Sequence, residues 1–313
     1  MTARTFVISV ALLLATSIAA WPQSKQTTKQ QSKGALSPAG PKDAKMPTCP
    51  QSKGIVCATR REKTTTRTFW CCAPWSCVPG DLSKCQRPQS WTWCYNSDNE
   101  FSPETVIQGC SATIDSRQES QSNRSVAYYY RGTAWRRKGE YDRAIADFNE
   151  AIKIDPRYTY AFLSRGNAWA DKREYDRAIT DYNEAIRLDP QFALAYENRG
   201  DTWDDKGDLD RALDDLNRAI AIDSARPRAF FLRGYVLKKK NEFDRAIADF
   251  TEAIRLDPKF ALAYENRGDI RDDRGELDLA FADLTRAIEL DPKRARAYFL
   301  RGYVLKRKKE YDR

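Results

Sequence analysis

The side chains in this sequence best suited to covalent or metal chemistry are its eight cysteines. All of them lie in one stretch near the N-terminus: Cys49, Cys57, Cys71, Cys72, Cys77, Cys85, Cys94 and Cys110. An even number of cysteines confined to one segment predicts a disulfide framework. The sequence contains no C-x-x-C spacing, and Cys72 and Cys77 are the nearest approach to it. A thiol–disulfide enzyme and a zinc site built from thiolates are therefore both disfavoured.

The rest of the sequence offers no catalytic set. There is no histidine, which removes imidazole acid–base chemistry, Ser-His and Cys-His nucleophiles, and histidine metal ligands. Carboxylates are plentiful, but no two of them stand out as an acid–base pair in opposed environments. We therefore predict a protein that is not an enzyme and that uses no cofactor and no metal.

Four tryptophans accompany the cysteines: Trp70, Trp75, Trp91 and Trp93. They belong to a Cys/Trp-rich unit, residues 49–95, which is too small to be stable through a hydrophobic core alone and needs cross-links. We expect an irregular fold of loops and short strands. The tryptophans either form the core of this unit or present a stacking platform for a cell-wall glycan. Glycan binding through this unit, with the rest of the chain as an adaptor, is the alternative function that we keep.

The N-terminus predicts export. Residues 1–20 combine one positive charge with an apolar run of about 15 residues, which is short for a membrane span. Small residues permit cleavage after Ala19 or Ala20, as in a secretory signal peptide. We therefore expect a periplasmic or secreted protein with no integral membrane span after cleavage, an uncleaved anchor being the alternative. Residues 21–48 are rich in Lys, Gln, Ser and Pro and predict a disordered linker.

A capping region, residues 96–124, precedes a long repetitive part. Pro103 marks a helix start, and Val106, Ile107, Cys110 and Ile114 form an apolar stripe with helical spacing. We interpret the region as the second helix of a degenerate half-repeat. A disulfide between Cys94 and Cys110 would fasten the small unit to this cap.

From residue 125 to residue 313 the chain repeats every 34 residues. Five full units begin at Ser125, Thr159, Ala193, Pro227 and Ala261, and an incomplete sixth unit begins at Ala295. The eighth place of each unit is glycine, and the twentieth and twenty-seventh places of each full unit are alanine. Small residues there let two helices approach closely. The best self-similarity nevertheless spans 68 residues, between Tyr196 and Tyr264.

This pattern resembles the tetratricopeptide repeat (TPR) family over about three fifths of the chain. The resemblance implies an all-α fold, a right-handed superhelical solenoid of antiparallel helix pairs, here preceded by the small disulfide-rich irregular segment. Gly139, Gly207 and Gly275 are expected to adopt left-handed turns between the helices of a unit. Arg271 replaces the tryptophan or leucine of other units, and we expect it to extend outward to solvent.

The resemblance also implies a concave groove lined by the first helices of the units. At its family positions the third and fifth units are acidic, whereas the fourth and sixth are basic and aromatic. The residues expected to bind a partner are Arg228, Phe231, Tyr235, Lys238, Lys239, Glu197, Asp201, Asp204, Asp205, Glu265, Asp269, Phe299 and Tyr303. The doubled period therefore belongs to the groove, because the packing positions keep the shorter one.

Two interpretations of these charged bands remain open. Neighbouring first helices lie about one helix diameter apart, so acidic and basic bands may simply pair with each other, at roughly 0–1 kcal/mol for each exposed pair. Alternatively the groove binds a protein or peptide of alternating charge, with the aromatic residues as anchors. Export makes nucleic acid an unsuitable partner, and the Lys and Asn pattern of chaperone-binding members is missing. The function predicted is a non-enzymatic scaffold or adaptor of the cell envelope.

The last unit repeats the interior pattern of the others. Tyr298, Leu300, Val304 and Leu305 occupy places that are packed elsewhere in the array, although a terminal unit normally has a polar outer face. We expect the sequence to be a piece of a longer array. An exposed last unit also offers a route to self-association.

Overall fold

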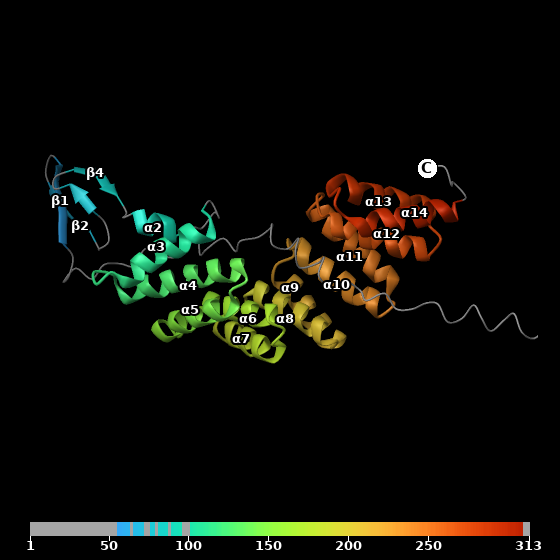
Figure 1. The fold of residues 1–313 in the computed structure, drawn as a ribbon, viewed down its shortest axis with the longest axis horizontal. Helices are drawn as coiled ribbons and strands as arrows, with labels where there is room; N and C mark the ends of the chain where they lie inside the picture. Colours follow the sequence, from blue (N-terminus) through green and yellow to red (C-terminus); the bar gives the residue numbers. More distant parts are fainter. Residues whose placement is uncertain are drawn as a thin grey trace, which may run out of the picture. The chain divides into compact units, whose positions relative to one another are not determined.

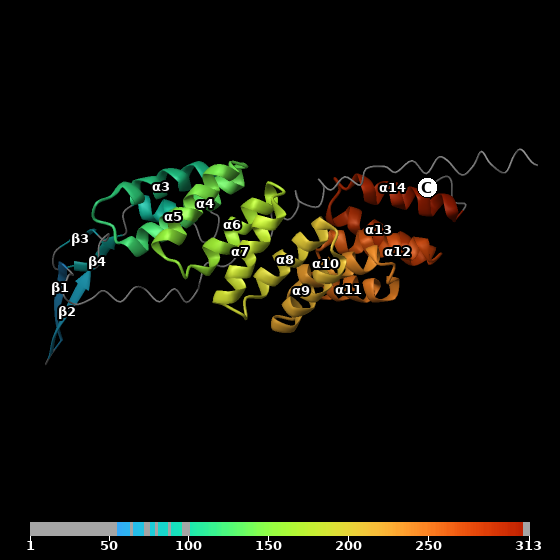
Figure 2. The ribbon, with the colours of Figure 1, turned by 90° about the horizontal axis from the view of Figure 1, so that it is seen from below.

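The computed structural model describes residues 55–62, 65–71, 76–78, 81–86, 89–95 and 101–308. The predicted signal peptide and linker, residues 1–20 and 21–48, lie outside the described residues. Where the structure describes the chain, it consists of four short strands followed by thirteen helices. Figure 1 shows the helices following one another in sequence order, and Figure 2 shows the same order from below.

Two hairpins form the described part of the Cys/Trp-rich unit. Strand β1 (Ile55–Glu62) pairs antiparallel with β2 (Thr65–Cys71), with Glu62 opposite Thr65, and β3 (Ser76–Val78) pairs with β4 (Asp81–Gln86). The threonine-rich run around the first turn favours extended backbone. This part is therefore more regular than the irregular segment expected from the sequence.

A disulfide joins the two helices that precede the repeats. Cys94 ends α2 (Gln89–Cys94), Cys110 lies in α3 (Pro103–Asp115), and the two cysteines are bonded and buried, as predicted. Ser102 caps α3 by accepting a hydrogen bond from the backbone N–H of Thr105. Gly109 is required for the close approach of α2, because a Cβ there would lie 2.6 Å from the backbone oxygen of Ser90. The α2–α3 pair is thus a shortened helix hairpin packed on the first repeat.

One tryptophan of the predicted stacking platform belongs to this core. Trp91 is buried, and its indole N–H donates a 2.8 Å hydrogen bond to Oε1 of Glu119. A ring enclosed in this way cannot stack on a glycan, because its faces are already in contact with protein. Trp93 is half-buried, and the side chains of Trp70 and Trp75 lie outside the described part.

The repeats form eleven helices, which alternate between first and second helices of the units. In order they are α4 (Gln121–Lys138), α5 (Tyr141–Ile154), α6 (Thr159–Asp171), α7 (Tyr175–Leu188), α8 (Ala193–Lys206), α9 (Leu209–Ile222), α10 (Pro227–Lys239), α11 (Phe243–Leu256), α12 (Ala261–Asp273), α13 (Leu277–Leu290) and α14 (Ala295–Arg307). Each helix packs mainly on the helices before and after it. This is the local contact pattern of a TPR solenoid, in which stability comes from neighbouring elements.

The glycine at the eighth place of a unit receives an aromatic or leucine side chain from the second helix. At Gly166, an added Cβ would lie 2.7 Å from Cε1 of Tyr182, and that ring is fully buried. Ala178 and Ala185 flank the ring on the same helix and are completely buried. Small residues therefore set the distance between the paired helices, as the sequence predicts.

The turn inside each unit needs one residue with positive φ. Gly139, Gly207 and Gly275 adopt φ of 82°, 88° and 78°, which confirms the prediction for them. Arg173 and Asn241 occupy the same place in the second and fourth units with φ of 65° and 61°. The turn geometry is therefore set by the helix pair, because it persists where the residue is not glycine.

Candidate partner-binding face

The predicted groove residues lie on α8, α10, α12 and α14, the first helices of four successive units. We call the surface that they form the first-helix face. It contains Glu197, Asp201, Asp204 and Asp205 on α8, Arg228, Phe231, Tyr235, Lys238 and Lys239 on α10, Glu265 and Asp269 on α12, and Phe299 and Tyr303 on α14. The structure links these four helices by ion pairs.

Glu197 is completely buried between two guanidinium groups. Its carboxylate accepts hydrogen bonds from Nε of Arg226 at 2.7 Å and from Nη1 of Arg228 at 2.5 Å. Nη2 of Arg228 also donates to Asp201 at 2.8 Å. Burial alone would lower the pKa of Arg228, but the charges of Glu197 and Asp201 outweigh it and raise the pKa above its ordinary value. This cluster fixes α8 to the start of α10.

The same cluster recurs 68 residues later. Glu265, 2% exposed, accepts from Nε of Arg294 at 2.7 Å and from Nη1 of Arg296 at 2.9 Å. Arg296 also donates to Asp269 at 2.5 Å. The doubled sequence period is therefore the period of a buried ion cluster that joins an acidic unit to the basic unit after it.

A second row of pairs runs through the ends of the same helices. Nζ of Lys239 donates to both carboxylate oxygens of Asp204 at 2.7 Å, and Arg307 donates to Asp272 at 2.7 Å. Lys238 turns the other way and pairs with Asp269 of the following unit. The acidic and basic bands thus pair with each other, which is the first of the two interpretations that the sequence left open.

The aromatic residues of the first-helix face are not equivalent. Phe231 is only 3% exposed, because it packs against Phe250, with ring centroids 5.7 Å apart, and against Phe260, at 4.9 Å. The expectation that packing does not require this ring is wrong. Tyr235 is half-buried beside it, with Nζ of Lys239 4.7 Å from its ring centroid. Phe299 and Tyr303 of the sixth unit are 72% and 50% exposed.

Arg271 does not extend outward as expected. Its side chain is 17% exposed, and Nη1 donates a 2.7 Å hydrogen bond to Asp283 of the same unit. Asp283 already accepts two hydrogen bonds from Arg267, so the carboxylate that every full unit provides also neutralises the additional arginine. The reason is availability, because a buried charged partner lies within reach of the Trp position.

The sequence interpretation missed that internal pair. In each full unit the arginine before the conserved-spacing glycine donates two hydrogen bonds to an aspartate 16 residues later, such as Arg165 to Asp181 at 2.9 and 2.6 Å. The five pairs are Arg131–Asp147, Arg165–Asp181, Arg199–Asp215, Arg233–Asp249 and Arg267–Asp283. The signal was present, since both residues recur every 34 positions.

A polar chain continues the first-helix face toward the N-terminal units. The side-chain oxygen of Asn167 accepts from the Tyr182 hydroxyl at 2.8 Å and from Nδ2 of Asn198 at 2.9 Å. Nη1 of Arg228 then donates to Asn198 at 3.0 Å. Asn198 was not among the predicted residues, because it does not stand at a family groove position.

We expect Asp269 to make the contacts of α12 sensitive to acid. Burial alone would raise the pKa of its carboxyl, but the charges of Lys238 and Arg296 outweigh burial and hold the pKa below its usual value. A carboxylate with a lowered folded pKa stabilises the fold fully above its unfolded pKa, near about 4, and this stabilisation is lost as the pH falls through the folded pKa. Amide protection factors in α12 should therefore fall below about pH 4. Asp269→Asn should remove much of that fall, whereas Asp214→Asn on exposed α9 should leave it; equal profiles in both variants would contradict the assignment.

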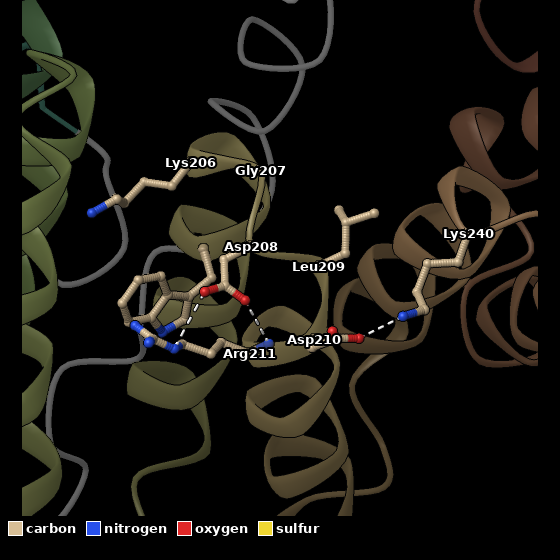
Figure 3. A pocket seen from close by; sticks show the side chains of 8 residues that line it. Lys206, Gly207, Asp208, Leu209, Asp210, Arg211 and Lys240 are labelled. Atoms are coloured by element: carbon tan, nitrogen blue, oxygen red, sulfur yellow. Dashed lines mark hydrogen bonds and ion pairs between the residues drawn. The ribbon is translucent and has the colours of Figure 1, made fainter.

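The largest surface hollow lies away from the first-helix face. It has a volume of about 610 Å³ at the turn between α8 and α9 and is lined by Trp203, Asp208, Asp210, Arg211 and Lys240, among others (Figure 3). It is shallow, and its carboxylates are occupied: Asp208 pairs with Arg211 at 3.3 Å, and Asp210 with Lys240 at 2.5 Å. The guanidinium of Arg211 also covers the indole of Trp203, 4.6 Å from the ring centroid. The hollow therefore offers no free recognition group.

Comparison with known proteins identifies the repeat. Sequence profiles described as tetratricopeptide repeat match residues 125–158 and, in two overlapping stretches, 231–293 and 273–313, and a profile described as TPR repeat matches residues 166–202. These matches fall on the helix pairs described above. The chain belongs to the tetratricopeptide repeat family. No curated protein sequence matches it.

Solved structures agree with this assignment at the level of the fold. Pseudomonas aeruginosa pilF is 19% identical, with a TM-score of 0.58 over 62% of this chain and 88% of that one. A tetratricopeptide repeat protein from Parabacteroides merdae is 20% identical, with a TM-score of 0.56 over 71% and 85% of the two chains. MamA is 29% identical over 52% of this chain and 96% of its own, with a TM-score of 0.47. At these identities the first two show that the array has the TPR fold.

Two further site types were sought in the TPR protein. Among the described residues, no group of three or more cysteine, aspartate or glutamate side chains is arranged to hold a metal ion. In the same part of the chain, none of the helices combines the length and apolar character that crossing a membrane requires. The first-helix face is therefore the surface on which a functional argument can be built.

Proposed function

We propose that this TPR protein is a non-enzymatic scaffold or adaptor that binds a protein or peptide partner along its first-helix face. TPR arrays are in general protein-interaction scaffolds, and the family assignment supports this role. The proposal includes export to the periplasm or beyond, on the strength of residues 1–20. N-terminal sequencing of the exported chain should then give Ala20 or Trp21 as the first residue.

The observation that carries the proposal is the partial exposure of the paired charges. Arg228 and Asp201 keep 27% and 35% of their side chains exposed, and Lys239 keeps 30%. Half-buried Tyr235 lies between these pairs and those of Lys238. A partner segment with its own charges can therefore share these groups, and a ring or aliphatic side chain can pack on Tyr235.

The pairing also decides how the proposal must be tested. Reversing Lys239 alone would place two like charges together and would disturb the array as well as the binding surface. Exchanging the two partners, Asp204→Lys with Lys239→Asp, keeps an ion pair while inverting its polarity. A matched control is Asp210→Lys with Lys240→Asp, an equivalent exposed pair at the turn in Figure 3, away from the first-helix face.

We expect a partner captured by the full chain at low salt to be released by high salt, because screening weakens partly exposed charges. The Asp204/Lys239 exchange should reduce capture about tenfold or more, as rearranged interface charges do, whereas the Asp210/Lys240 exchange should leave capture unchanged. Equal capture by both exchanged proteins would show that the bands serve only to hold the units together.

A further inference from the structure

The far side of α14 differs from every other first helix in the described array. Phe299, Tyr303 and Tyr298 are 72%, 50% and 44% exposed, the largest exposed aromatic surface among the described residues. A Cβ added at Gly302 would meet nothing within 4 Å. At Gly132, Gly166, Gly200, Gly234 and Gly268 the same Cβ would approach a side chain within 3.0 Å.

Helix α10 shows what this surface accepts, because its sequence is almost the same. The two helices read PRAFFLRGYVLKK and ARAYFLRGYVLKR. On α10 the ring of Phe250 lies over Gly234, at 3.0 Å from the position of a Cβ, and packs against Phe231. Phe231 of α10 is consequently 3% exposed, whereas its equivalent Phe299 is almost fully exposed.

Charge gives a second, independent vacancy. Five equivalent arginines each hold an aspartate of a second helix, as Arg233 holds Asp249 with two hydrogen bonds of 2.8 and 2.7 Å. Arg301 is the sixth of these arginines and has no carboxylate partner among the described residues; it reaches Thr285 at 3.5 Å and lies over the ring of Tyr298. The missing ligand is thus an aspartate directly before an aromatic or leucine residue.

From these observations we propose that the far side of α14 is a docking site for an amphipathic helix of a partner protein, with the pattern Ala-x-x-Asp-Phe-x-x-Ala. The alanines permit close approach, the aspartate binds Arg301, and the aromatic ring packs over Gly302 against Phe299. This is helix-in-groove recognition, in which regularly spaced anchors supply the affinity. Strongly basic α14, with Arg301, Lys306 and Arg307, suits an acidic helix better than a second copy of itself. The site is separate from the ion pairs of the first-helix face on α8 and α10.

The test uses the chain's own α11 sequence as the probe. A fluorescent synthetic peptide of residues 243–256 is titrated with the full chain, and binding is followed by anisotropy. We expect saturable binding, weakened about thirtyfold when the peptide carries Phe250→Ala, since it loses its central anchor. The peptide with Asp249→Ala should also bind more weakly, because Arg301 then stays unpaired.

Gly302→Ala is the decisive variant of the chain. It adds one methyl group where nothing lies within 4 Å, and alanine is favoured over glycine in a helix, so the free protein should remain folded. It should nevertheless weaken the peptide about tenfold or more, because the methyl group occupies the place of the docked ring. The Asp204/Lys239 exchange should leave peptide binding unchanged, which separates this proposal from that for the first-helix face.

Three outcomes would overturn the inference. One is the absence of binding at about 100 µM peptide, far above the affinity of a useful interface. Another is equal binding by the chain with Gly302→Ala, which would mean that the peptide displaces its own α11 instead. The third is dimerisation of the chain that Gly302→Ala abolishes, because the occupant of this face would then be a second copy of the protein.

Discussion

Glu197→Gln is expected to lower the free energy of unfolding of the units around α8 and α10 by about 3 to 5 kcal/mol. The carboxylate is completely buried and neutralises Arg226 and Arg228, which are 20% and 27% exposed. Glutamine keeps the shape and one acceptor but removes the charge, so two guanidinium groups remain with one carboxylate, Asp201, to share. Removing one member of a buried ion cluster costs far more than the cluster's net contribution to stability.

Amide hydrogen exchange is the measurement of choice for Glu197→Gln, because a repeat array need not unfold in one step. Protection should fall in α8 and α10 and should be retained in α4 and α5. Asp214→Asn is the matched control: it removes an exposed carboxylate of the adjacent helix and should change stability by less than about 0.5 kcal/mol. A loss no larger than that of the control would mean that the cluster sets only the order of the units.

Removing the Cys94–Cys110 disulfide is expected to destabilise the α2–α3 hairpin by about 3 kcal/mol, the value for a closed loop of about 15 residues. The two cysteines are 16 residues apart and fully buried. The double variant Cys94→Ala and Cys110→Ala leaves the six other cysteines as an even set, so no single thiol is created. Alanine also leaves small voids beside Val106 and Ala127, which adds to the loss.

The cost of losing the disulfide should be local. Exchange of the α3 amides should become faster by about two orders of magnitude, whereas amides of α10 to α13 should be unaffected, because each unit contacts only its neighbours. If α3 keeps its protection, the packing of Gly109 against α2 suffices to hold the cap. If the distant helices lose protection as well, the array is more cooperative than its contacts indicate.

The sequence by itself determined the periodic part of this protein. Glycine at the eighth place and alanine at the twentieth and twenty-seventh permit a single spacing between paired helices, so the 34-residue period implied a helix-pair array. The Gly139 turn, the helix at Pro103 and the Cys94–Cys110 bond also followed from residue type and spacing, because each depends on contacts close along the chain. The structure confirms all three.

Tertiary structure alone decided what the first-helix face is made of. Residues at one family position look alike in sequence, yet Phe231 is buried by α11 and Phe260, while Phe299 is exposed. Likewise, whether Lys239 meets Asp204 or solvent depends on the distance between neighbouring first helices, which no single unit encodes. Arg271 was misjudged for the same reason, since its partner Asp283 comes from the facing helix. Periodicity shows which residues recur, but burial and pairing depend on which side chains the neighbouring helices bring against them.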